Sequence, residues 1–121
     1  MAFREEPKPP EQFMYRFDVW LSLNDKNGEK VDRRKFVEFE SELYDRFRGL
    51  TRTPIVGNPV FEGYWEDPET QNAARDLNTI YTVLTPQDSK SYDFFVKNKL
   101  RWAAYFGQKK ILITVHPVEA V

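Results

Sequence analysis

The chain has 121 residues, of which 40% are hydrophobic and 16% aromatic, so it has enough apolar material for the core of one domain. Its formal net charge of -1 excludes the broad positive field on which non-specific binding to nucleic acids or anionic membranes depends, but leaves room for a local basic patch. The absence of cysteine excludes disulfides and thiolate metal sites.

The first twelve residues, MAFREEPKPPEQ, combine prolines with charged residues and contain no apolar run. They are not typical of a signal peptide, and no later apolar stretch approaches the roughly 20 residues of a membrane helix. We therefore expect residues 1–12 to form a flexible arm and residues 13–121 a single domain. We also expect a soluble, cytoplasmic protein with no membrane partner.

Residues 13–23, FMYRFDVWLSL, show the strongest strand pattern in the chain. The odd-numbered positions are all apolar, whereas the even positions include Arg16, Asp18 and Trp20. This period of two predicts that the odd side faces a core and the even side points away from it. The dipeptide Asn27-Gly28 then predicts a turn.

Asp32 is a suitable N-cap for a helix that follows it, and Gly49 is suitable for the C′ position after its last turn. The inward residues of this helix recur at steps of three and four: Phe36, Phe39 or Glu40, Leu43 and Phe47.

Two strands are predicted next, at about residues 51–65 and 75–84, around a polar loop. Pro54 and Pro59 place the first of them at a sheet edge, because proline has no amide hydrogen to donate.

A second helix begins after Asp88 or Ser89 and is ended by Gly107. The stretch KKILITVH then predicts the last strand. Apolar spacing predicts these inward residues for the second helix: Tyr92, Phe95, Val96, Leu100, Ala103 and Phe106.

The order strand, helix, strand, strand, helix, strand predicts an α+β domain of the ferredoxin-like βαββαβ type, with a four-stranded antiparallel sheet and two helices on one face. The stretches DRFRGLT, NPVFEGYWEDPET, IYTVLT and ILITVHPVEAV resemble an uncharacterised family of short bacterial proteins, common in cyanobacteria. That family carries an arginine-phenylalanine-glycine-leucine-threonine stretch and a later glycine-x-tryptophan, and Arg48 stands where its first motif has glycine. The resemblance implies a ferredoxin-like fold and a bacterial source, and it brings no catalytic residues.

His116 is the only histidine. A general base or metal ligand is one interpretation, since imidazole titrates near neutral pH, but a strand-end residue before Pro117 is the simpler one. With one histidine and no cysteine, we expect no metal site and no cofactor. No Gly-x-Ser-x-Gly turn presents a serine nucleophile, and the glycines are scattered singly, so catalytic residues stay unknown.

The even side of the first strand and the last strand together predict an open sheet face. An exposed tryptophan there is costly, so we expect this face to be covered, most simply by a second copy in a homodimer. If the covered space instead forms a cleft, as in dimeric α/β barrels, the protein is a small enzyme or small-molecule binder. The residues that would line that site are Arg16, Asp18, Trp20, Thr114 and His116.

A basic patch within KNKLRWAAYFGQKK is interleaved with aromatic residues, a composition that also suits RNA contacts. The commoner meaning of such a stretch is the solvated face and last turn of a helix, and nucleic acid is not the expected partner. A self-associating binding module is therefore the leading hypothesis, a small-molecule site the first alternative and an RNA contact the second. The patch comprises Lys97, Lys99, Arg101, Lys109 and Lys110.

Overall fold

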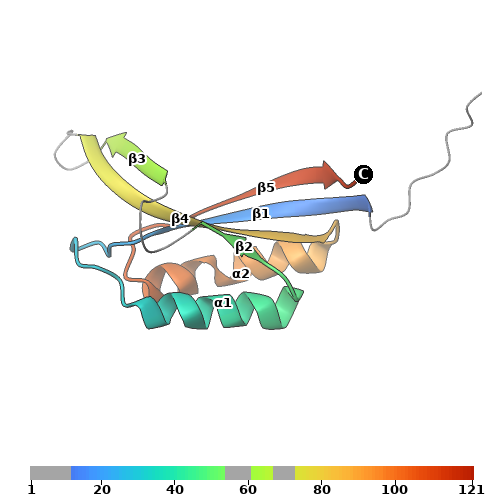
Figure 1. Ribbon diagram of the computed structural model, residues 1–121, viewed down its shortest axis with the longest axis horizontal. Helices are drawn as coiled ribbons and strands as arrows, with labels where there is room; N and C mark the ends of the chain where they lie inside the picture. The colour runs from blue at the N-terminus through green and yellow to red at the C-terminus, as the bar shows by residue number, and fades with distance from the viewer. Residues whose placement is uncertain (1–11, 54–60, 67–72) are drawn as a thin grey trace, which may run out of the picture.

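A computed structural model describes residues 12–53, 61–66 and 73–121 and has the predicted ferredoxin-like architecture. Both helices lie on one face of an antiparallel sheet, and the other face is uncovered by helices (Figure 1). The elements in chain order are β1 (Phe13–Ser22), α1 (Arg33–Phe47), β2 (Thr51–Arg52), β3 (Phe61–Glu66), β4 (Ala73–Pro86), α2 (Ser89–Tyr105) and β5 (Leu112–Glu119).

The second strand of the ferredoxin-like fold is divided into two pieces. Tyr81 of β4 pairs with Val19 of β1 on one side and with Arg52 of β2 on the other. Further along β4, β3 pairs on that same outer side, opposite β1. The sheet order is β2-β4-β1-β5, and β3 also pairs with β4. Because β2 and β3 occupy the same position beside β4, the sheet has the four-strand order of the ferredoxin-like fold. The second strand lies at the edge of the sheet, as predicted. Pro54 and Pro59 lie outside the described residues.

The core lies between the helices and the odd side of β1, as the alternation predicted. Phe17 of β1 stacks on Phe95 of α2 with ring centroids 4.1 Å apart, and Phe39 of α1 meets Trp102 of α2 edge to face at 5.0 Å. Such aromatic pairs contribute about 0.5–1.5 kcal/mol beyond their burial. The largest fully buried side chains are Trp102, Tyr81, Phe17, Phe36, Phe39, Phe95, Phe106, Leu21, Leu43, Ile111, Val19 and Val83.

Local signals correctly predicted where the helices begin. Asp32 accepts a hydrogen bond from the amide of Arg34 at 2.9 Å, and Asp88 accepts one from the amide of Ser91 at 2.8 Å. Each bond satisfies an amide that has no partner within its own helix. The predicted end of α1 is wrong by one residue, because Arg48 takes the left-handed conformation (φ 62°) that the sequence assigned to Gly49.

The predicted inward face of α2 is partly wrong. Tyr92, Val96 and Leu100 are 47%, 61% and 81% exposed, whereas Trp102 is 1% exposed. The reason is that α2 packs against α1 as well as against the sheet. Its buried surface is therefore turned toward α1, and the side that carries Tyr92 remains exposed to solvent. Of the predicted arm, only Gln12 is described, and its carbonyl accepts from the amide of Ala120 at 2.7 Å.

In the described part of the chain, no helix is both long and apolar enough to cross a membrane.

Candidate functional site

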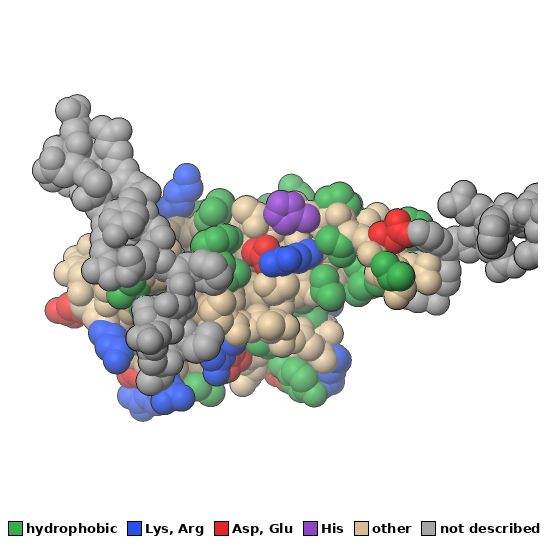
Figure 2. Space-filling view, turned by 45° about the horizontal axis from the view of Figure 1, so that its top comes forward, with side chains coloured by type: hydrophobic (Ala, Val, Ile, Leu, Met, Phe, Trp, Pro, Cys, Tyr) green, Lys and Arg blue, Asp and Glu red, His purple; other side chains and the backbone are tan. Residues whose placement is uncertain are grey.

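Strand pairing gathers the predicted site residues on the face that the helices leave open. Arg16 of β1 lies opposite His116 of β5, and Asp18 lies between Thr114 of β5 and Thr82 of β4. Directly opposed residues of antiparallel strands have Cβ atoms about 4.5–5.5 Å apart and share a face. Figure 2, turned to bring this face forward, shows the histidine beside a basic and an acidic side chain, with hydrophobic side chains to either side.

Asp18 forms a buried polar centre for this face. Its Oδ1 accepts a hydrogen bond from the Thr82 hydroxyl at 2.6 Å and one from Arg16 Nε at 3.2 Å. The Asp18 side chain is only 9% exposed, whereas that of Arg16 is 50% exposed. A buried carboxylate is costly unless it is paired and hydrogen-bonded, so Thr82 and Arg16 together make its burial tolerable. Sequence reasoning missed Thr82, because only strand register brings it to Asp18.

Arg16 is held through Nε, and its two terminal nitrogens are left to contact a ligand. The bond to Asp18 uses Nε, and among the described residues nothing else bonds the guanidinium. The two terminal nitrogens form one of the edges by which a guanidinium binds a planar anion in a bidentate manner. The exposed His116 ring and the half-buried Thr114 hydroxyl lie on neighbouring positions of β5. This arrangement can donate several hydrogen bonds to one anionic group.

Apolar side chains border this polar centre. Leu84 of β4, opposite Arg16, is 52% exposed, and Leu112 of β5, opposite Trp20, is 51% exposed. Trp20 itself is only partly exposed within a single copy. The prediction that Trp20 leaves a large ring in water is therefore wrong, and the open-face argument for a homodimer loses its main premise.

The basic patch lacks the stacking surfaces that its sequence suggested. Trp102 and Phe106 are each 1% exposed and belong to the core. Arg101 forms an ion pair with Glu42 of α1 and bonds Asn98 at 3.0 Å. The remaining members of the patch, Lys97, Lys99, Lys109 and Lys110, lie on α2 and in the segment that leads to β5.

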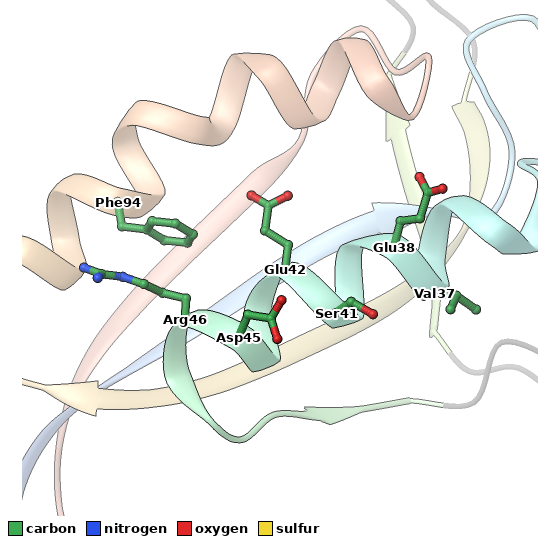
Figure 3. Close-up of a pocket in the computed structure, with 7 residues that line it drawn as sticks. All are labelled: Val37, Glu38, Ser41, Glu42, Asp45, Arg46 and Phe94. Carbon is green, nitrogen blue, oxygen red and sulfur yellow. The ribbon is translucent and has the colours of Figure 1, made fainter.

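A groove between the two helices, on the side away from the sheet, was not anticipated from the sequence. It has a volume of about 600 Å³, and Figure 3 shows Glu38 and Glu42 of α1 pointing across to α2, with Arg46 beside Phe94. Glu42 accepts from the indole nitrogen of Trp102 at 3.2 Å, and Glu38 accepts from the Tyr105 hydroxyl. These hydrogen bonds join α1 to α2. The two carboxylates therefore have a structural role, and their presence in the groove does not require a bound ligand.

Within residues 12–53, 61–66 and 73–121, no cluster of three or more histidine, aspartate or glutamate side chains has the placement needed to hold a metal ion.

Comparison with known proteins supports the fold. No protein-family model matches the chain, and no curated protein sequence matches it significantly. Among solved structures, a phage SAM lyase in complex with S-methyl-5′-thioadenosine is similar over 98% of this chain and 97% of its own, with a TM-score of 0.58 and 8% sequence identity. At that identity the similarity shows a shared fold and nothing further.

Proposed function

We propose that the protein is a binding module that takes a small anionic molecule on the open face of its sheet. The observation that carries the proposal is the half-exposed Arg16 guanidinium, which the buried Asp18 carboxylate holds by Nε. A guanidinium fixed in this way loses little conformational freedom when it binds a carboxylate or phosphate group. His116 and Thr114 supply further donors beside it.

Two further observations support a small ligand. The polar residues lie at the centre of the face and the exposed leucines at its border, an arrangement in which apolar contacts bind the body of a ligand and polar groups orient it. The phage SAM lyase, whose fold this chain shares, forms a complex with the small nucleoside S-methyl-5′-thioadenosine, so the fold is compatible with small-molecule binding. The ligand class of this chain is inferred from its own Arg16 and not from that protein.

Self-association through the open face is a second candidate, favoured by Leu84 and Leu112, which are 52% and 51% exposed. It accounts less well for Arg16 and Asp18, because an apolar contact between two copies needs neither a buried carboxylate nor a guanidinium held by it. An RNA contact has less support, since Trp102 and Phe106 are buried and unavailable for stacking on bases.

The single histidine offers a local probe of the proposed site. We expect titration with inorganic phosphate or acetate to shift the NMR resonances of the His116 ring, with saturation in the millimolar range or below. Arg16→Lys keeps the positive charge but removes the planar fork, and should weaken binding by about tenfold or more. The matched control is Arg34→Lys on α1, because the Arg34 side chain is 88% exposed and lies in the helix layer, on the other side of the sheet from the open face.

The proposal fails if the His116 resonances stay unshifted with both anions. It also fails if Arg16→Lys, checked for native structure by circular dichroism, binds as well as the unmodified chain. Shifts with S-methyl-5′-thioadenosine but with neither anion would support a small-molecule site and overturn the anionic class of its ligand.

A further inference from the structure

The side of α2 that faces neither α1 nor the sheet carries an apolar stripe. Tyr92, Val96 and Leu100 follow one another at steps of four residues, so they lie on one face of the helix. Their exposed fractions, 47%, 61% and 81%, increase along the helix. We call these three residues the α2 stripe. A contiguous exposed patch of this kind marks an interaction site more often than single exposed apolar residues do.

The α2 stripe continues into a groove beside β5. The groove has a volume of about 170 Å³ and lies between α2 and the helix-facing side of the strand. Apart from Lys99, its lining is aromatic or aliphatic: Phe17, Tyr92, Phe95, Val96, Ile113 and Val115. The lateral surface of the domain is therefore one apolar band, formed by α2 in the helix layer and β5 at the edge of the sheet.

The outer edge of β5 is able to pair with another strand. Among the described strands, β5 pairs with β1 alone. The amide of Ala120 bonds Gln12 in line with β1, and amide direction alternates along a strand, so the even-numbered amides of β5 point to β1. The amides of Ile113 and Val115 then point outward. Pro117, which has no amide hydrogen, falls on the same outward side and limits pairing to the first half of β5.

We propose that this lateral surface joins two copies of the chain about a two-fold axis, with β5 pairing antiparallel to β5 and the α2 stripes in contact. The spacing of the strands in the sheet and that of the helices beside it both allow this contact. Because α2 lies over β1 and β5, joining the two edges at the strand spacing of about 4.8 Å brings the two α2 helices to roughly 10 Å, a normal helix packing distance.

A second copy fits this surface because the surface complements itself. The α2 stripe is symmetric in spacing about Val96, so an antiparallel partner helix places Tyr92 near Leu100 of the second copy. On the solvent side of the stripe, the exposed Asp93 and Lys97 lie one turn apart. The same antiparallel arrangement places Asp93 of each copy within one turn of Lys97 of the other, and the two Lys97 side chains within one turn of each other. A foreign strand would gain the edge of β5 but would not reproduce this charge match.

This surface is separate from the open face, so the inference does not depend on the proposed anion site. It predicts that the unmodified chain sediments as a dimer at tens of micromolar. Val96→Glu places a carboxylate in the contact twice, once from each copy, and should weaken dimerisation by more than about tenfold. The matched control is Val37→Glu on α1, because Val37 is also exposed, at 52%, and lies outside the stripe.

Leu100→Glu provides a second variant, chosen because Leu100 is 81% exposed and we expect a charge at so exposed a position to leave the fold intact. Leu84→Glu tests the competing contact through the open face. The proposal is supported if the Val96 and Leu100 variants are folded monomers while the Val37 and Leu84 variants remain dimers. It is overturned if the unmodified chain is a monomer, if both stripe variants stay dimeric, or if Leu84→Glu alone dissociates the dimer.

Hydrogen exchange tests the pairing of the strands independently of mass. In the dimer, the amides of Ile113 and Val115 should be protected, and Val96→Glu should make them exchange as fast as exposed amides. A dimer in which these two amides exchange rapidly would exclude the β5 edge from the contact.

Discussion

The hydroxyl of Thr82 on β4 donates a 2.6 Å hydrogen bond to Oδ1 of Asp18 on β1, across the centre of the uncovered sheet face. The two residues are direct partners in the β1–β4 ladder. The same carboxylate oxygen accepts a hydrogen bond from Arg16 Nε. Thr82 therefore helps to position Asp18, which in turn holds the Arg16 guanidinium of the proposed anion site.

Thr82→Val should destabilise the fold by about 1–3 kcal/mol, because it removes one donor from a buried carboxylate while keeping the β-branched shape. Thr114→Val is the matched control, since Thr114 is the other strand partner of Asp18 and forms no hydrogen bond with it. Urea unfolding would measure both. Equal losses in the two variants would show that the Thr82 hydroxyl has no special role.

Tyr81 should make stability fall at high pH. Burial raises the pKa of its phenol above the usual value, and the hydrogen bond it donates to Glu40 at 2.9 Å raises it further. At high pH the folded chain then keeps the phenol proton while the unfolded chain loses it. The contribution of Tyr81 to the free energy of unfolding is therefore complete below about pH 10 and declines as pH rises above that value.

The corresponding variant is Tyr81→Phe, which at neutral pH should lose about 1 kcal/mol with the hydrogen bond. Above about pH 10, its free energy of unfolding should decline less steeply with pH than that of the unmodified chain. The other tyrosines are the same in both proteins, so the difference between the two curves isolates Tyr81. Parallel curves throughout this range would contradict the assignment.

Arg48→Gly should stabilise the chain by about 1 kcal/mol. Arg48 has φ 62°, a left-handed conformation that strains any residue with a Cβ atom and suits glycine after a helix. The gain is reduced by loss of the contact between the Arg48 guanidinium and the Tyr44 ring, 5.8 Å apart. Arg48→Ala is the control, because it removes the same contact and keeps the strain, and a gain in that variant would point away from the backbone.

The cap of α2 should matter least in acid. The hydrogen bond from the Ser91 amide lowers the pKa of the Asp88 carboxyl, so its stabilising contribution is present above the unfolded pKa near 4 and is lost as pH falls through the folded value. Asp88→Ala should therefore lower the melting temperature at neutral pH and have a smaller effect below about pH 3. Asp88→Asn keeps the acceptor and should be milder at neutral pH.

Local sequence was sufficient for the order of the helices and strands, although it predicted β2 and β3 as one strand. The alternation of β1 identified its buried side correctly, because Phe17, Val19 and Leu21 are core residues. The caps Asp32 and Asp88 act on amides two or three residues away, so a short stretch of sequence contains the whole interaction. These elements in this order allow few topologies, and the ferredoxin-like arrangement followed from them.

Tertiary structure decided which surfaces are buried and which remain free. Apolar residues cover most of the circumference of α2, so its spacing fits a core face through Val96 as well as one through Trp102. Only the position of α1, which meets Trp102 through Phe39 and Glu42, selects the second. Likewise the burial of Asp18 depends on Thr82, 64 residues away, because strand register and not sequence spacing brings the two together.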